Sequence, residues 1–266
     1  MKISFIGAGN MAGAIINGLI NSGFPVSDIT VSDSDHSKLT ELKKSGVVAV
    51  YSNSEAAQAS DIIVLSVKPS VVSSVLEELG TSGAATGKIL VSIAAGISSS
   101  FLKENIGQDT KVVRTMPNTP AMVGEGMTVI CTPENLTETE LDAVKSIFQA
   151  VGRVEVLDEK YIDAVTAISG SGPAYVCMFI EAMADGGVLC GLPRAQALQL
   201  ATQTIMGTAK MIIESGINPA VLKDMVCSPG GTTIEAVHEL EQGGMRASLI
   251  SAVKRCANKS ATLGGK

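Results

Sequence analysis

The feature that most restricts the fold is a glycine-rich turn near the N-terminus. The segment FIGAGNMA, residues 5–12, places the pattern Gly7-Ala-Gly-Asn-Met-Ala12 after an apolar strand-like run and before a helix-like run, Asn10–Asn21. Glycines here allow a tight strand-to-helix turn and the close approach of a pyrophosphate, whose charge the helix N-terminus stabilises. Asp33 ends the second predicted strand at the spacing of a ribose-binding acid. The segment therefore predicts a dinucleotide-binding βαβ unit.

The first 160 residues continue this alternation of strands and helices. Strands are predicted at Lys2–Gly7, Ile29–Asp33, Val47–Tyr51, Asp61–Val67, Lys88–Ala94, Lys111–Thr115, Met127–Cys131 and Arg153–Asp158. Helices between them include Asn10–Asn21, Asp35–Ser45 and Thr137–Gln149, the last with a capped start. Strands rich in valine and isoleucine, separated by helices, are typical of a doubly wound parallel sheet covered on both faces. We expect an α/β fold in which residues 1–160 form a Rossmann-type dinucleotide-binding domain.

The strand pattern stops near Tyr161, and the rest of the chain is predicted to be helical. The expected helices are Pro173–Cys190, Pro193–Ser215, Ala220–Met225, Thr233–Glu241 and Met245–Ala261. They are more apolar than one small bundle needs, so burial between two subunits is the economical explanation and a compact monomeric bundle is the alternative. Residues 161–266 are therefore predicted to form an all-helical dimerisation domain.

Composition excludes several classes of function. A net charge of −6, 3% aromatic residues and scattered lysines and arginines argue against nucleic-acid binding. The odd number of cysteines, five, without CxxC spacing indicates reduced thiols in a cytoplasmic protein, and two histidines far from any cysteine make a metal site unexpected. We expect no signal peptide and no membrane span.

A second glycine turn lies far along the chain, in VCSPGGTTIE, residues 226–235. Two glycines, a proline and three hydroxyl side chains precede a helix-like run, and such a turn presents backbone N–H groups to an anion. Further candidate loops follow the strands, where ligands of doubly wound sheets bind: Ser66–Pro69, Ala94–Gly96 and Met116–Pro120. In them Lys68 is either near the nucleotide or a surface lysine, and Asn118 either contributes to the site or braces its own turn.

Taken together, these segments resemble the pyrroline-5-carboxylate reductase family. The resemblance rests on FIGAGNMA (5–12), SVKP (66–69), RTMPNTP (114–120), SGSGPAY (169–175), ADGGVLCGLPR (184–194) and LKDMVCSPGGTTIEAV (222–237), in the family's order. It implies a Rossmann domain followed by a helical domain that interlocks with a second subunit, in homodimers and often in rings of dimers. It also implies reduction of L-1-pyrroline-5-carboxylate, a cyclic imine bearing a carboxylate, to L-proline by NAD(P)H, the last step of proline biosynthesis.

The resemblance also assigns residues to the site. The expected cofactor contacts are Ile6, Gly7, Ala8, Gly9, Asn10, Met11, Ser32, Asp33, Asn53, Ser66, Val67, Lys68, Pro69, Ile93, Ala94 and Ala95. The expected substrate contacts are Ser228, Gly230, Gly231, Thr232 and Thr233, and Thr233 matches the threonine proposed to hydrogen-bond the ring nitrogen. The family often has serine or a neutral residue in place of Asp33 and usually prefers NADPH, so the choice between NADPH and NADH stays open. Met225 stands where some relatives carry asparagine.

Two other classes of function are weighed against this one. A hydroxyacid or imine dehydrogenase of the same two-domain plan needs a catalytic lysine, for which Lys210 and Lys223 are the internal candidates, and neither lies in a glycine-flanked motif. A non-catalytic dinucleotide-binding module has no need of a second anion site. The loops expected at the site contain no histidine, no cysteine–histidine pair and no paired carboxylates, so no strong side-chain acid is expected.

Overall fold

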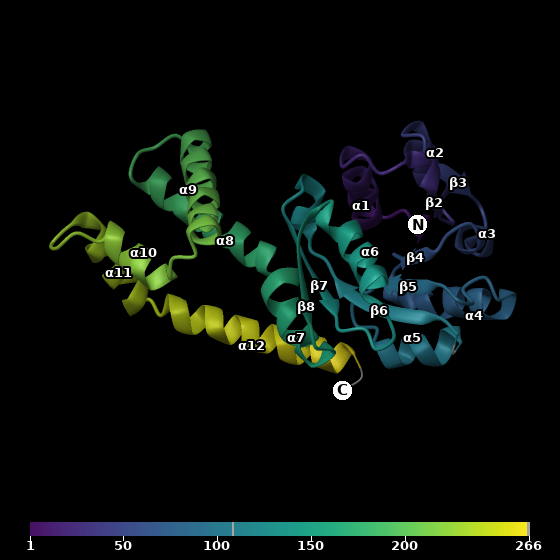
Figure 1. Ribbon diagram of the computed structural model, residues 1–266. Coiled ribbons are helices and arrows are strands. Elements are labelled where there is room, and N and C mark those ends of the chain that lie inside the picture. The colour runs from purple at the N-terminus through teal and green to yellow at the C-terminus, as the bar shows by residue number, and fades with distance from the viewer. Residues whose placement is uncertain (108, 265–266) are drawn as a thin grey trace. The chain divides into compact units, whose positions relative to one another are not determined.

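The computed structural model describes residues 1–107 and 109–264 and divides into two compact units (Figure 1). Unit 1 comprises Met1–Gly170 together with the chain from Cys256 onward, and unit 2 is Ser171–Arg255. The division thus follows Gly170, whereas the sequence pattern changes near Tyr161. The predicted roles of residues 1–160 and 161–266 stay predictions.

Unit 1 contains a single eight-stranded sheet in the order β3-β2-β1-β4-β5-β6-β7-β8 (Figure 1). Its strands are β1 (Ile3–Ile6), β2 (Ile29–Ser32), β3 (Val48–Val50), β4 (Ile62–Leu65), β5 (Ile89–Ser92), β6 (Lys111–Met116), β7 (Gly126–Cys131) and β8 (Gly152–Leu157). Each predicted strand is present, within one or two residues at its ends. The order reverses at β1, which lies between β2 and β4, and this reversal creates the crevice used by ligands in such sheets.

One strand pair departs from the predicted parallel sheet. β6 and β7 run antiparallel, with Thr115 opposite Ile130, while β7 and β8 are again parallel. The connection between β6 and β7 holds only the 3₁₀ helix η3 (Thr119–Val123). A parallel connection needs a crossover of a dozen or more residues, so this shorter segment returns the chain in the opposite direction.

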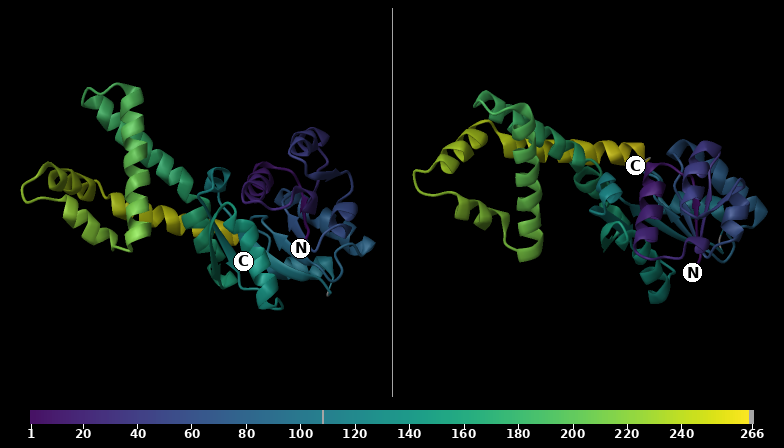
Figure 2. Two further views of the ribbon diagram at one scale, coloured as in Figure 1. Left: turned by 45° about the horizontal axis from the view of Figure 1, so that its top comes forward. Right: turned by 90° about the horizontal axis from the view of Figure 1, so that it is seen from above.

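Helices cover both faces of the sheet and bury two separate cores (Figure 2). The six main helices are α1 (Asn10–Asn21), α2 (His36–Lys44), α3 (Asn53–Gln58), α4 (Val72–Ser82), α5 (Ser99–Ile106) and α6 (Glu138–Gln149). Successive strand residues point to opposite faces, so Phe5 packs in the core of α1, α2 and α6 while Ile6 packs in that of α3, α4 and α5. The predicted capped start of α6 is confirmed, since Thr137 and Glu140 form a reciprocal capping box.

Unit 2 is helical and buries few of its apolar side chains. It is built from α8 (Gly172–Leu189), α9 (Arg194–Ser215), α10 (Pro219–Val226), α11 (Thr232–Gln242) and the first part of α12 (Met245–Leu263). α8 and α9 pack through the small residues Ala184, Ala197 and Ala201. Many larger apolar side chains are exposed, among them Met178, Phe179, Leu189, Leu200, Met206, Met211, Ile213 and Ile250. No helix within the described residues is both long and apolar enough to span a membrane.

In unit 1 an ion pair joins β6 to the segment that follows β8. Arg114 on β6 is 7% exposed, and its Nη1 lies 2.7 Å from Oε1 of Glu159 in η4 (Glu159–Tyr161). The same oxygen accepts the N–H of Ser99, the first residue of α5, at 3.0 Å. Burial alone would raise the pKa of Glu159, but these hydrogen bonds and the Arg114 charge lower the pKa below its ordinary 4.5. The charged carboxylate therefore stabilises the fold.

We predict that Glu159→Gln destabilises the protein in a pH-dependent way. Because the folded-state pKa is depressed, the charge of Glu159 contributes fully above about pH 5 and its contribution is lost as pH falls through the folded pKa. Urea unfolding at pH 7 should give a loss of about 1–2 kcal/mol, shrinking below pH 4. Glu155→Gln, at an exposed position on β8, is the control and should change the free energy of unfolding by less than about 0.5 kcal/mol. A pH-independent loss would contradict the electrostatic role.

Candidate functional site

The first candidate site forms around Gly7, at the end of β1. Gly7 has φ of +99°, and its N–H donates to the carbonyl of Ser32 at 2.8 Å. A β-carbon at this position would lie 2.7 Å from the carbonyl oxygen of Ser66, closer than side chains approach backbone. Both the left-handed conformation and the lack of space therefore require glycine.

Gly9 differs from Gly7 because it faces open space. It is the N-cap of α1 in an extended conformation, with no side-chain cap, and a β-carbon built on it would have no neighbour within 4 Å. The space beside Gly9 is therefore open, and no side chain caps the first N–H groups of α1. This open cradle fits a dinucleotide pyrophosphate, which needs exposed N–H donors and a close approach to the backbone.

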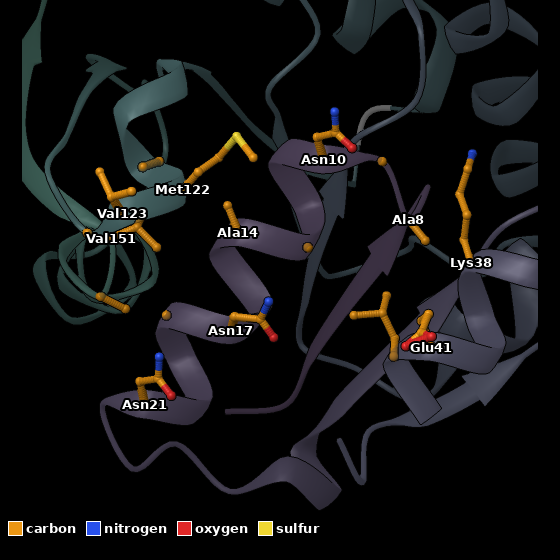
Figure 3. A pocket seen from close by; sticks show the side chains of 17 residues that line it. Ala8, Asn10, Ala14, Asn17, Asn21, Lys38, Glu41, Met122, Val123 and Val151 are labelled. Atoms are coloured by element: carbon orange, nitrogen blue, oxygen red, sulfur yellow. The ribbon is translucent and has the colours of Figure 1, made fainter. Parts of the chain in front are cut away.

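A groove of about 780 Å³ begins at this cradle and continues along α1 (Figure 3). α1 forms its base, Met122 and Val123 of η3 line one side, and Lys38 and Glu41 of α2 line the other. Three of the predicted cofactor residues, Ala8, Gly9 and Asn10, line this groove. Another predicted residue, Lys68, is exposed and lies directly before η2 (Pro69–Val71).

Hydrogen bonds join the ends of β1, β2 and β4 around the glycine turn. Ser66, after β4, donates its hydroxyl to the carbonyls of Gly7 at 2.7 Å and Ile6 at 3.0 Å. Asp33, after β2, accepts the N–H of Ala8 at 2.7 Å. The structure therefore brings the predicted residues of these three loops together at one edge of the sheet.

The neighbouring loops add two further predicted residues to this edge. Ser32 donates its hydroxyl to Oδ1 of Asn53 at 2.9 Å, and the Asn53 amide donates to Glu78 at 2.7 Å. Glu78 was not expected from the sequence, because nothing in its local pattern distinguishes it from a surface carboxylate of α4. Ile93, after β5, donates its N–H to Leu65 at 3.1 Å and so holds the Ile93–Ala95 loop beside β4.

The side chain of Asn118 has hydrogen-bond partners on two other segments of unit 1. Its amide donates to the carbonyl of Ser169 at 3.0 Å, and its Oδ1 accepts the N–H of Met127 at 2.8 Å. Ser169 lies in the π-helix η5 (Thr166–Gly170), which follows α7 (Ile162–Val165). Asn118 therefore connects the loop after β6 to the SGSG segment, a contact between residues about 50 positions apart that local sequence does not reveal.

The second candidate site lies in unit 2, at the start of α11. Gly230 has φ of +66°, and the N–H of Gly231 donates to the carbonyl of Ser228 at 3.0 Å. Gly231 is the N-cap of α11 without a side-chain cap, so the first N–H groups of Thr232 and Thr233 have no capping partner. Thr233 is partly buried and Thr232 is exposed. The turn thus has the geometry of an anion site built from backbone donors.

Other groups in unit 2 have partners of their own. Lys210 and Lys223, the candidates for a catalytic lysine in the alternative dehydrogenase function, each pair with a carboxylate. Lys210 lies 3.7 Å from Glu214, and Lys223 lies 2.8 Å from Asp224. His238 lies beside Gln242, with 2.8 Å between their Nε2 atoms. Across the described residues no cluster of three histidine, cysteine, aspartate or glutamate side chains has the arrangement of a metal site.

A doubly wound sheet with a glycine turn at its reversal point is the architecture of dinucleotide-binding proteins, and here a helical unit with a second uncapped helix start follows it. Residues 2–96 match the family described as NADP oxidoreductase coenzyme F420-dependent, and residues 159–263 match that described as pyrroline-5-carboxylate reductase dimerisation. The chain belongs to the pyrroline-5-carboxylate reductase family.

Individual relatives support this assignment over the whole chain. The pyrroline-5-carboxylate reductase of Escherichia coli is 48% identical over 98% of each chain, and that of Arabidopsis thaliana is 48% identical over 98% of this chain and 95% of its own. A solved pyrroline-5-carboxylate reductase from Coxiella burnetii has a TM-score of 0.94 at 36% identity over 98% of both chains. The Plasmodium falciparum enzyme, solved with NADP bound, has a TM-score of 0.88 at 35% identity over 99% of this chain and 98% of its own.

We predict that alanine at Gly7 and at Gly9 has different effects. Gly7→Ala should unfold the protein or lower its melting temperature by several degrees, because the new methyl group meets the Ser66 carbonyl at a positive φ. Gly9→Ala should keep the wild-type melting temperature and weaken dinucleotide binding at least tenfold, because its methyl group projects only into the open cradle. Calorimetric melting and titration with NADPH measure the two effects. Unchanged NADPH binding in Gly9→Ala would contradict the cradle assignment.

Proposed function

We propose that this chain is a pyrroline-5-carboxylate reductase that converts L-1-pyrroline-5-carboxylate to L-proline with a reduced nicotinamide dinucleotide, NADPH. The observation that carries the proposal is a pair of uncapped helix starts, at Gly9 and at Gly231, each suited to an anion. Two anionic ligands take part in this reaction, a dinucleotide and an imine bearing a carboxylate. Membership in the reductase family supports the same pairing of ligands with sites.

The cofactor residues are proposed from the edge of the sheet in unit 1. The N–H groups at the start of α1 would hold the pyrophosphate, and Gly9 would leave space for it. We propose that the predicted cofactor residues line the site as a whole: Ile6–Met11, Ser32, Asp33, Asn53, Ser66–Pro69 and Ile93–Ala95. The bound dinucleotide supplies the hydride that reduces the C=N bond.

The substrate residues are proposed from the turn before α11. The backbone N–H groups of Thr232 and Thr233 and the hydroxyls of Ser228 and Thr232 would bind the carboxylate without an arginine, and Gly230 and Gly231 would shape the turn around it. The Thr233 hydroxyl would hydrogen-bond the ring nitrogen and orient the imine for attack, since hydride transfer depends on close alignment. A cyclic imine is basic enough to bind partly as its iminium form, so its nitrogen can already carry the proton that the product needs. Thr233 is then an orienting group rather than an acid.

We also propose that the chain forms homodimers in the cytoplasm and that these associate into a higher oligomer of dimers. The exposed apolar side chains of unit 2 and its match to a dimerisation family support the dimer. Five cysteines, an odd number without CxxC spacing, support a reducing compartment. Sedimentation velocity measures the number of subunits.

Turnover of the purified chain tests the reaction directly. With L-1-pyrroline-5-carboxylate we expect loss of the reduced-nicotinamide absorbance, faster with NADPH than with NADH at equal concentration, and formation of L-proline. The two cofactors are compared side by side at saturating imine. Absence of proline with both cofactors would overturn the proposed reaction.

We predict that Thr233→Ala lowers kcat by about 10- to 100-fold and changes the Kd for NADPH by less than about twofold. Loss of the hydroxyl removes an orienting hydrogen bond at the reacting ring and leaves the unit 1 residues untouched. Thr233→Ser, which keeps the hydroxyl, is the matched control and should retain most of the turnover. Fluorescence titration measures NADPH binding, and an equal loss of NADPH affinity in Thr233→Ala would contradict the assignment.

A further inference from the structure

We propose that Asp33 anchors the glycine turn from within and that Lys38 is the residue that selects a dinucleotide carrying a 2′-phosphate. The inference rests on the proposed use of a nicotinamide dinucleotide and deepens it. In the common arrangement of such sites, an acid at the end of the second strand binds the ribose hydroxyls and so favours NAD. The contacts of Asp33 differ from that arrangement.

Both carboxylate oxygens of Asp33 accept backbone hydrogen bonds. Oδ2 accepts the N–H of Ala8 at 2.7 Å, and Oδ1 accepts the N–H of Asp35 at 2.7 Å. The side chain is only 10% exposed. The first bond joins the end of β2 to the glycine turn itself, 25 residues earlier in the chain. Asp33 therefore stabilises the conformation of the turn, and each of its oxygens already accepts a backbone N–H.

Lys38 offsets the charge of this buried carboxylate and stays accessible. Its Nζ lies 3.6 Å from Oδ2 of Asp33 and 3.8 Å from Oδ2 of Asp35, and the Lys38 side chain is 45% exposed. Together with Ala8 and Gly9 it lines the groove that begins at the pyrophosphate cradle (Figure 3). An ammonium group in this position can bind a phosphate as a point charge.

The local charge balance makes Lys38 the deciding group. Asp33 and Asp35 contribute two negative charges here, and the pKa of Asp35 is lowered by hydrogen bonds from the hydroxyl and N–H of Ser37. Without Lys38 a 2′-phosphate would meet both carboxylates uncompensated, whereas ribose hydroxyls carry no charge to repel. Removal of Lys38 should consequently weaken a 2′-phosphorylated ligand and spare its unphosphorylated counterpart.

Two nucleotide fragments test the selection without the reaction. 2′,5′-ADP carries the 2′-phosphate, and 5′-AMP lacks it. For Lys38→Met, calorimetric titration at low salt should show 2′,5′-ADP bound about tenfold or more weakly and 5′-AMP within about twofold of wild type. Lys44→Met removes another ion-paired lysine of α2, the partner of Glu41 at 2.9 Å, and should leave both affinities unchanged. Equal loss of both fragments, or no loss of either, in Lys38→Met would overturn the role of Lys38.

Variants of Asp33 test the anchor. If Asp33 holds the glycine turn, Asp33→Ala should weaken NADPH and NADH by similar factors, about fivefold or more. If Asp33 were a ribose ligand, the same change would weaken NADH and strengthen NADPH, and that result would overturn the anchor. Asp33→Asn keeps one acceptor for the Ala8 N–H and should bind both cofactors better than Asp33→Ala. Should Asp33→Ala not fold, Asp33→Asn decides alone, because stronger NADPH binding with weaker NADH binding again overturns the anchor.

These outcomes are separable from those of the proposed reaction. A chain that binds 2′,5′-ADP through Lys38 but forms no proline would contradict the reductase activity and leave the cofactor inference standing. If the protein forms proline but Lys38→Met leaves cofactor selection unchanged, the reductase activity stands and the role of Lys38 is contradicted.

Discussion

The backbone of Gly7 is the point on which the dinucleotide edge of the sheet depends. β1 lies between β2 and β4 in the sheet. The Gly7 N–H donates to the carbonyl of Ser32, the last residue of β2, and the Gly7 carbonyl accepts the hydroxyl of Ser66, which follows β4. The next N–H, that of Ala8, is bonded to Asp33. Three strand ends thus share one turn, and only a residue without a β-carbon fits between them. The direction of α1, and with it the position of its free N–H groups, follows from this turn.

Much of unit 1 could be predicted because its signals are local. The α1 helix occupies the predicted Asn10–Asn21, and the capped start of α6 at Thr137 needs only residues within one helical turn. The reversal between β6 and β7 was missed because the strand pattern reports burial but not direction. The short connection through η3 could have predicted the antiparallel direction of β7, since it leaves no room for a crossover.

Side-chain partners distant in sequence were the part that could not be predicted. Spacing alone made Asp33 a candidate ribose acid, yet spacing does not tell which way a carboxylate points, and here it points to Ala8. Asn118 was ambiguous for the same reason, because its partner Ser169 is brought near only by the fold. Glu159 shows no local motif at all, and its pairing with Arg114 depends on the sheet order β6-β7-β8, which brings the segment after β8 near β6.

The two proposed anion sites have the same physical basis, which suits a chain of net charge −6. Each uses the uncapped start of a helix, where backbone N–H groups and the helix dipole attract an anion without adding a mobile cation. Backbone donors are held rigidly by the glycine turns, so they are already oriented when a ligand arrives. They cannot, however, distinguish one anion from another, because a row of N–H groups donates hydrogen bonds to any phosphate or carboxylate. Under the proposals made above, discrimination would come from side chains beside each turn: a cation, Lys38, at the first, and a hydroxyl, Thr233, at the second.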